Sequence, residues 1–179
     1  MKTYQLNVAG LSRSLPICKI NDNLSIAAFI IFGDVELTCE CARALIPRLP
    51  EHDIMMVAEA KGIPLIHELA RQMGINQYIV ARKIPKLYMQ SPIHVTVKSI
   101  TTEKEQTLYI DKNDAFLIKN KRVLLIDDVI STGESMRALE ALACKAGGTI
   151  AGRAAILAEG DAADRDDIIF LEKLPLFLS

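Results

Sequence analysis

The amino-acid sequence predicts an α/β fold in which a parallel sheet carries helices on both faces. Short runs such as DIMMVA (residues 53–58) and VLLI (residues 123–126) are almost continuously apolar. Runs of this kind are typical of strands that are buried on both sides. They alternate with segments of helical character, and this alternation indicates a parallel sheet covered by helices.

The first half of the chain is predicted to hold two helices among short strands. Residues 15–20 fit a short strand, and the helix over residues 34–49 ends at its prolines, Pro47 and Pro50. A second helix ends at Gly74, a residue type that commonly follows a helix. That helix and two buried strands cover residues 62–73, 53–58 and 77–81.

The second half begins with a predicted pair of strands, residues 94–100 and 106–110, around the polar turn TTEKE. Another buried strand covers residues 123–126, and a helix follows over residues 133–146, where two glycines end it. Late strands are predicted over residues 150–157 and 167–171. No repeat, low-complexity tract or linker interrupts this order, so we expect one domain over residues 1–179.

Composition excludes some functions. A net charge of −1 and a pI of about 6.3 give no reason to expect binding to nucleic acid or to a membrane. The opening residues lack the apolar stretch of a secretory signal, and the apolar residues 26–32 are far fewer than the ~20 that span a bilayer. Four cysteines without a matching metal-site partner are interpreted as reduced thiols, which fits a cytoplasmic protein: Cys18, Cys39, Cys41 and Cys144.

Three strand ends carry polar segments: EAKGIP (residues 59–64), RKIPK (residues 82–86) and DDVISTGES (residues 127–135). In parallel α/β sheets, ligands bind beyond the carboxyl ends of the strands. In the third segment, Gly133 permits a tight turn among hydroxyl side chains at the start of a helix. The amides at a helix N-terminus favour an anion by ~0.3–1 kcal/mol, so this segment suits a phosphate monoester. It matches neither a Walker A loop nor a dinucleotide fingerprint.

Asp127 and Asp128 directly precede this turn, and ionised carboxylates only accept hydrogen bonds. Two adjacent acceptors suit the vicinal hydroxyls of a ribose or a hydrated magnesium ion. Together with the phosphate site they indicate a ribose 5-phosphate. Cationic side chains from the first two segments suit a pyrophosphate and would offset the repulsion between the aspartates: Lys61, Arg82, Lys83 and Lys86.

Each segment alone also has a plainer interpretation. An acidic pair at a strand end can be a solvated loop or a helix cap, and a Lys-Gly or Arg-Lys pair can be a surface turn. Their occurrence after three successive core strands favours the functional interpretation. The three histidines have no matching partners and are interpreted as structural, and residues 103–105 as a solvated turn.

VLLIDDVISTGES resembles the signature with which type I phosphoribosyltransferases bind phosphoribosyl pyrophosphate (PRPP). EAKGIP and ARKIPK resemble the adenine and xanthine branch of that family, and the resemblance covers about residues 15–157. It implies a type I phosphoribosyltransferase-like sheet with a small N-terminal hood over about residues 1–32 and a mobile loop. The implied partners are PRPP, a purine base and a second subunit of a homodimer.

The resemblance also implies roles for individual residues. The 5-phosphate would be held by Ile130, Ser131, Thr132, Gly133, Glu134 and Ser135. Pyrophosphate would be held by Glu59, Ala60, Lys61, Gly62, Arg82 and Lys86. The catalytic residues would be Asp127, Asp128 and Lys83, with both aspartates positioning Mg²⁺ through water. The mobile loop would include Ser99, Thr101, Thr102 and Glu103.

The implied reaction transfers 5-phosphoribose from PRPP to a purine in purine salvage. Adenine enzymes usually carry a Tyr and a Glu-Tyr-Gly pattern in the mobile loop, but here the segment reads KSITTEKEQTLYI. Glu103 could replace the usual loop glutamate after a one-residue slip. That segment, together with EAKGIP and ARK, resembles the xanthine branch at least as well. The phosphate loop STGES, where adenine enzymes typically have ATGGT, favours adenine, so adenine is predicted first and xanthine close behind.

Two other classes remain. A PRPP-sensing regulatory module without catalysis would keep the ligand motif, but we would expect an N-terminal DNA-binding domain, for which residues 1–14 leave no room. A phosphoacceptor receiver domain also carries acidic strand ends, but its acidic pair would lie near the N-terminus rather than at residues 127 and 128.

Overall fold

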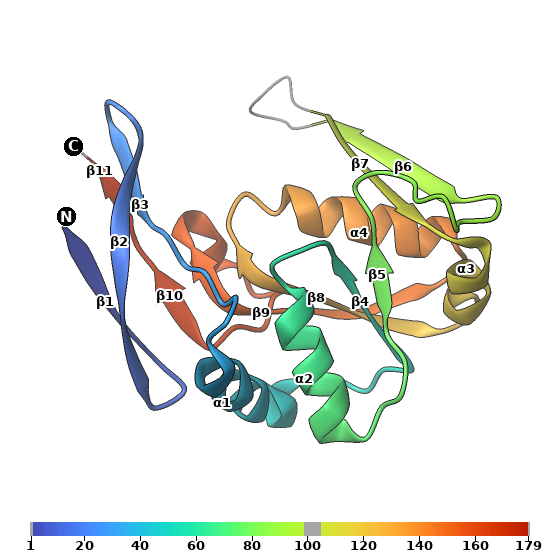
Figure 1. Ribbon diagram of the computed structural model, residues 1–179, viewed down its shortest axis with the longest axis horizontal. Coiled ribbons are helices and arrows are strands. Elements are labelled where there is room, and N and C mark those ends of the chain that lie inside the picture. The colour runs from blue at the N-terminus through green and yellow to red at the C-terminus, as the bar shows by residue number, and fades with distance from the viewer. Residues whose placement is uncertain (1, 99–104, 179) are drawn as a thin grey trace.

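The computed structural model describes residues 2–98 and 105–178. Its central sheet has the strand order β10-β9-β8-β4-β5, and every pairing within it is parallel (Figure 1). This arrangement confirms the predicted α/β fold. The strands are β4 (Ile54–Ala58), β5 (Ile79–Ala81), β8 (Arg122–Ile130), β9 (Thr149–Glu159) and β10 (Glu172–Leu174).

Helices cover both faces of this sheet, as predicted. Successive residues of a strand point to opposite faces, so β4 contributes to two apolar clusters. Met55 and Val57 pack in one cluster with residues of α1 (Val35–Leu45) and α2 (Ile63–Met73). Met56 packs in the other cluster with α3 (Lys112–Ile118) and α4 (Glu134–Lys145).

A second, antiparallel sheet joins the two ends of the chain. Its order is β1-β2-β3-β11, so the C-terminal strand completes a sheet that the N-terminal residues begin (Figure 1). These strands are β1 (Thr3–Val8), β2 (Leu11–Asn21), β3 (Leu24–Ala27) and β11 (Leu176–Leu178). At the other side of the molecule, β6 (Ile93–Lys98) and β7 (Glu105–Ile110) form the predicted pair of strands, and this pair is antiparallel.

Several sequence predictions need correction. The helix predicted over residues 34–49 ends at Leu45 and continues as a 3₁₀ turn, η1 (Ile46–Arg48). The strand predicted over residues 167–171 is wrong, because only Ile169 bridges β9 there and β10 begins at Glu172. The apolar side chains of that segment pack on the two clusters instead. The sequence also gave no sign of α3, β1, β3, β11 or η2 (Gly160–Asp164).

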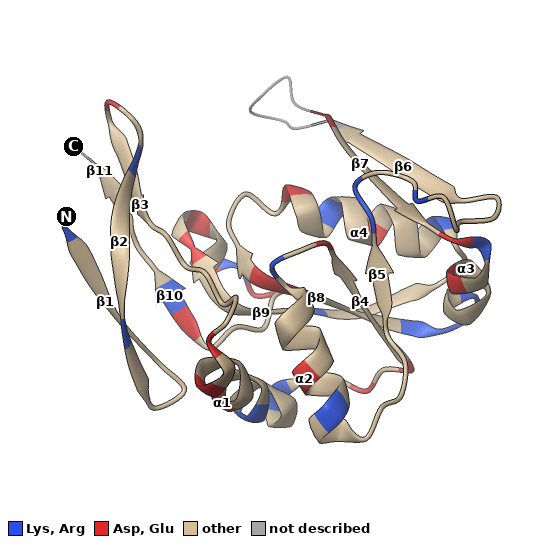
Figure 2. Ribbon diagram, in the orientation of Figure 1, with Lys and Arg blue, Asp and Glu red and all other residues tan. Residues whose placement is uncertain are grey.

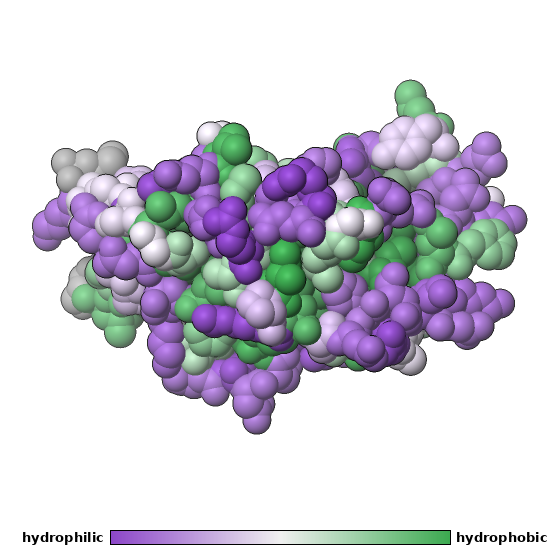
Figure 3. All heavy atoms as spheres, turned by 90° about the horizontal axis from the view of Figure 1, so that it is seen from below, coloured by the Kyte–Doolittle hydropathy of each residue, from purple (hydrophilic) through white to green (hydrophobic). Residues whose placement is uncertain are grey.

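On the face seen from below, apolar patches lie between hydrophilic side chains (Figure 3). Within residues 2–98 and 105–178, we find no helix that is both long and apolar enough to cross a membrane.

Candidate functional site

The turn between β8 and α4 encloses a cavity of about 110 Å³. Gly133 has a φ of +76°, in the left-handed region that favours glycine, and it directly precedes α4. The cavity is lined by all six residues that the resemblance assigned to the 5-phosphate, Ile130, Ser131, Thr132, Gly133, Glu134 and Ser135. Asp127 lines the same cavity, so the structure brings it together with this turn.

Backbone amides make this turn suitable for an anion. Gly133 has no side chain to cap α4, so the first amides of the helix lack a side-chain acceptor from that position. The guanidinium of Arg165 lies beside the turn, because a Cβ on Gly133 would come within 2.9 Å of Arg165 Nη1. Arg165 is itself ion-paired with Asp167 at 2.7 Å. The turn therefore combines amides and hydroxyls with a nearby positive charge.

Gln106 is part of this site, and the sequence did not single it out. It lies in β7, lines the cavity, and its Nε2 is 3.4 Å from Ser135 Oγ. Because Gln106 and Ser135 are 29 residues apart, no local motif marks the contact. This contact joins the β6–β7 hairpin to the start of α4.

The acidic pair is held at the end of β8 in two different environments. The side chain of Asp128 is 3 % exposed, and its Oδ2 is 3.2 Å from Lys61 Nζ. The angles at that contact are not those of a hydrogen bond, so Asp128 Oδ2 has no described hydrogen-bond donor. Asp127 Oδ1 accepts a hydrogen bond of 2.9 Å from the backbone N–H of Asp128. Burial, and then the neighbouring charge of Asp128, raise the pKa of Asp127.

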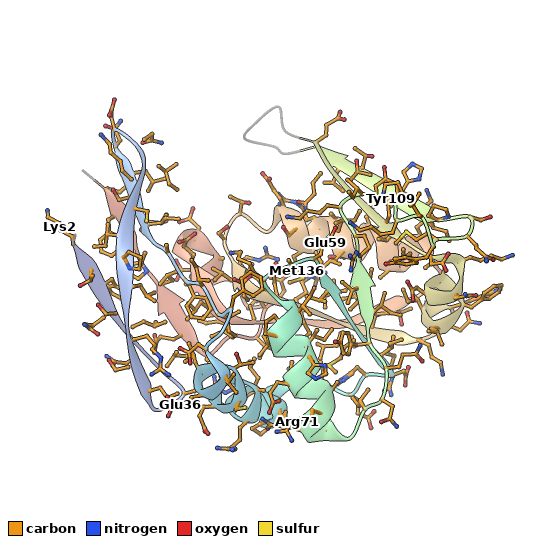
Figure 4. All side chains as sticks on the ribbon, in the orientation of Figure 1. Lys2, Glu36, Glu59, Arg71, Tyr109 and Met136 are labelled. Carbon is orange, nitrogen blue, oxygen red and sulfur yellow. The ribbon has the colours of Figure 1, made fainter. Side chains whose placement is uncertain are left out.

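The loop after β4 is tied to the loop after β5 by one carboxylate. Glu59, at the end of β4 (Figure 4), accepts a hydrogen bond of 2.6 Å from the backbone N–H of Lys83. Its other contacts are to Arg82 Nε at 3.0 Å and to Lys86 Nζ at 3.8 Å. Arg82 and Lys86 therefore already face a negative charge, whereas the side chain of Lys83 is exposed without a described ion pair.

Gly62 allows the loop after β4 to lie against β8. A Cβ at this position would come within 2.6 Å of Val57 Cγ2 and 3.3 Å of the Asp127 backbone. The neighbouring Ala60 and Lys61 are exposed, and the peptide bond between Glu59 and Ala60 is cis. The close approach brings Lys61 to Asp128, so two strand-end segments form one site. Figure 2 shows acidic and basic residues side by side at this end of the sheet.

Glu159 is a second residue that the sequence reasoning missed. It ends β9, where it is paired in register with Leu174 of β10, and its side chain is half-buried. Burial raises the pKa of its carboxyl group, while the charge of Lys61 opposes that shift. Glu159 is the second residue after the predicted strand over residues 150–157, so the strand-end rule that led to Asp127 could have found it. The predicted mobile-loop residues Ser99, Thr101, Thr102 and Glu103 lie outside the described residues.

Comparison of the sequence with known proteins identifies the family of this chain. A family model described as "phosphoribosyl transferase domain" matches residues 49–174. The chain is 37% identical over 113 residues to an adenine phosphoribosyltransferase of Bifidobacterium animalis subsp. lactis, covering 61% of this chain and 55% of the relative. It is 30% identical over 135 residues to a xanthine phosphoribosyltransferase of Bacillus cereus, covering 73% and 67%. The chain spans about half the length of the first curated relatives that it matches.

Solved structures agree on the fold. An adenine phosphoribosyltransferase from Thermoanaerobacter pseudethanolicus superimposes with a TM-score of 0.66 at 22% identity, covering 80% of this chain and 84% of that one. At this identity the similarity supports only the fold. The family model, by contrast, matches well over half of the chain and includes the turn before α4, the acidic pair and the loop after β4. The chain therefore belongs to the phosphoribosyl transferase domain family.

Proposed function

We propose that this chain is a purine phosphoribosyltransferase, which transfers 5-phosphoribose from PRPP to a purine nitrogen and releases pyrophosphate. The observation that carries the proposal is the cavity before α4, whose amides and hydroxyls lie beside the carboxylates of Asp127 and Asp128. A phosphate monoester and a vicinal diol are the two groups that such a site suits, and a ribose 5-phosphate carries both.

Each part of the substrate has a matching part of the site. The turn from Ile130 to Ser135 would bind the 5-phosphate, and Asp127 and Asp128 would accept hydrogen bonds from the ribose hydroxyls. Glu59, Ala60 and Gly62 would form the loop along the pyrophosphate. Positive charge for the pyrophosphate would come from Lys61, Arg82, Lys83 and Lys86.

The protein would act mainly by positioning and charge stabilisation. As pyrophosphate leaves, the anomeric carbon gains oxocarbenium character, and the cationic side chains stabilise the charge on the leaving group. Water could attack the anomeric carbon and hydrolyse the substrate. Closure of the loop that includes Ser99, Thr101, Thr102 and Glu103 would exclude that water.

The acidic pair suits a hydrated Mg²⁺ ion that would bind together with the substrate. Asp128 Oδ2 is buried without a hydrogen-bond donor, and a water molecule on a hydrated cation would supply one. Residues 2–98 and 105–178 contain no cluster of three or more His, Cys, Asp or Glu side chains that could cage a metal. Asp127 and Asp128 would therefore hold Mg²⁺ through water. When bound, the ion would share the negative charge of the pyrophosphate.

The base is proposed to be adenine, with xanthine as the next candidate. Matched relatives are named as adenine, xanthine and hypoxanthine/guanine phosphoribosyltransferases, and an adenine and a hypoxanthine/guanine relative are both 37% identical to this chain. The STGES turn supports the same order. The four bases differ in their ring substituents, so the substrate is decided by contacts to the base rather than by the phosphate site.

A homodimer would bring further positive charge to the site. Exposed apolar side chains surround Lys83 and Lys86 in the segment after β5, with Leu87 fully exposed and Ile84 and Tyr88 more than half exposed. Such a patch is typical of a protein interface. The partner subunit would then cover this segment, and the lysines of the partner's own segment would lie near the pyrophosphate. Light scattering coupled to size-exclusion chromatography would test the dimer directly.

Pyrophosphate release from PRPP tests the activity. The assay would contain Mg²⁺ and adenine, xanthine, guanine or hypoxanthine separately. Release with one base would establish the enzyme and identify its substrate. Tight binding of PRPP without release for any base would contradict the proposal and favour a PRPP-sensing module instead.

A further inference from the structure

A second cavity, of about 430 Å³, lies at the opposite end of the central sheet from the phosphate turn. It is lined by α3, by the last turn of α4 and by Ile93 at the start of β6. The turn that is proposed to bind phosphate precedes α4, whereas Lys145 and Gly147 lie at the other end of that helix. The 12 residues of α4 span about 18 Å at 1.5 Å per residue, so the two cavities can be occupied independently.

This second cavity is positively charged. Three lysines line it, Lys112, Lys119 and Lys145, and no acidic residue does. Lys145 Nζ donates a hydrogen bond of 2.8 Å to the backbone carbonyl of His94, and none of the three forms an ion pair with a described carboxylate. The nearest acidic residues in sequence, Asp111 and Asp114, form the capping box at the start of α3. The lining is therefore suited to an anion.

The same cavity has an apolar wall with an exposed ring. Ile93 and Ala115 contribute to the wall, and the side chain of Phe116 is 64% exposed. Lys112 Nζ lies 5.8 Å from the centroid of the Phe116 ring. An exposed aromatic ring with a cation beside it offers a stacking surface next to a site for negative charge. A ligand that matches both needs a flat ring and several anionic groups.

We propose that this cavity binds a nucleoside triphosphate, with its base against Phe116 and its phosphates among Lys112, Lys119 and Lys145. Its volume lies within the range of about 300–1,000 Å³ that small-molecule sites occupy. Three lysines match the charge of a triphosphate better than that of a monophosphate. This site is separate from the proposed PRPP site and does not depend on the proposed reaction.

Calorimetric titration of the full chain with ATP tests the proposal. The cavity variant Lys112→Gln/Lys119→Gln/Lys145→Gln is expected to bind ATP at least about tenfold more weakly than the wild type. The matched control, Lys2→Gln/Lys19→Gln/Lys173→Gln, removes the same charge from exposed lysines outside the cavity lining and is expected to bind ATP as the wild type does. Phe116→Ala should weaken ATP binding about fivefold but leave inorganic triphosphate binding unchanged.

Three results would overturn the proposal. The first is no binding of ATP to the wild type. The second is an equal loss in the cavity variant and in its lysine control, which would mean that net charge alone attracts the nucleotide. The third is loss of all ATP binding in Thr132→Ala/Ser135→Ala with no loss in the cavity variant, because ATP would then occupy the phosphate turn. Pyrophosphate release by the cavity variant, measured in parallel, reports on the proposed reaction separately.

Discussion

The loop after β4 and the turn before α4 lie at the same end of the sheet but differ in how their charges are arranged. In the first loop, Glu59 contacts Arg82 and Lys86, and Lys61 contacts Asp128. In the second, residues 131–133 carry no charged side chain and present hydroxyls and backbone amides around a cavity. The charged residues of the loop after β4 are therefore paired with residues of the loop after β5 and of β8, whereas the turn before α4 is open to an anion.

This difference separates two ways of binding phosphate groups. A 5-phosphate at the proposed site would enter the turn before α4 without breaking an ion pair of residues 131–133, because amides and hydroxyls would bind it. A pyrophosphate at the proposed site would compete with Glu59 for Arg82 and Lys86 and with Asp128 for Lys61. Its binding would therefore require these charged side chains to rearrange.

The largest expected effect comes from the acidic pair on β8. Asp127→Asn or Asp128→Asn should lower turnover by about 100-fold or more, because an amide would replace a carboxylate that is proposed to contact the reacting sugar. The fold should remain intact, since asparagine has nearly the same shape. Steady-state kinetics of pyrophosphate release, with circular dichroism of the same samples, measures both. Asp166→Asn, at an exposed position, is the control. Unchanged kinetics in both variants would rule out the assignment of the ribose site.

Gly133→Ala tests the open turn. Alanine at a φ of +76° is strained, and its Cβ would meet Arg165 Nη1 at 2.9 Å. We expect about tenfold weaker PRPP binding and a loss of about 1–2 kcal/mol in the free energy of unfolding. Gly33→Ala provides a matched control, because its φ is +81° but nothing lies within 4 Å of the added Cβ.

The two glycine variants should therefore differ in binding and not in stability. Urea unfolding and titration with PRPP measure the two quantities. If Gly33→Ala weakened PRPP binding as much as Gly133→Ala, the effect would come from general destabilisation and not from the turn.

Sequence reasoning succeeded where the determining pattern is local. VLLIDDVISTGES contains the strand, the acidic pair, the turn and the start of α4 within one continuous stretch. The strand predicted over residues 123–126 is too short, because β8 runs to Ile130 and includes the acidic pair. The buried strands β4 and β5 were recognisable in the same way, because a run of apolar side chains is enough to mark a strand covered on both faces.

The parts that were missed depend on contacts between distant residues. β11 becomes a strand by pairing with β3 about 150 residues earlier, and neither segment is distinctive alone. Gln106 reaches Ser135 only because the β6–β7 hairpin packs beside α4. The ion pairs of Glu59 likewise join two loops that no spacing rule connects. The sequence placed charges at the strand ends but could not tell which were already paired.

The ionisation of Asp127 should also change the free energy of unfolding with pH. Its pKa is raised in the folded chain, so the folded state holds the proton more tightly than the unfolded state. The contribution of Asp127 to stability is then fully present below the unfolded pKa of about 3.9 and is lost as pH rises toward the higher folded pKa. Asp127→Asn removes this loss and keeps the acceptor for the Asp128 amide.

We therefore expect Asp127→Asn to be more stable than the wild type by about 1 kcal/mol or more at neutral pH, with the difference vanishing near pH 4. Urea unfolding without ligand across that range measures it. A variant that is less stable than the wild type at neutral pH would show that the ionised carboxylate is stabilised where it lies.

The smallest expected effect concerns Glu59. A variant at this position tests the pairing of its carboxylate with the cations of the loop after β5. Glu59→Gln keeps an acceptor for the Lys83 amide but removes the negative charge that Arg82 and Lys86 face. Partly exposed ion pairs contribute about 0–1 kcal/mol, so pyrophosphate should bind about twofold to fivefold more tightly to the variant. Glu51→Gln removes a carboxylate from an exposed pair with Arg122 and is the control. Weaker binding of pyrophosphate to Glu59→Gln would mean that this carboxylate orders the cations for the ligand and does not compete with it. The loop after β4 and the turn before α4 would then differ in charge, but both would already be arranged to bind phosphate groups.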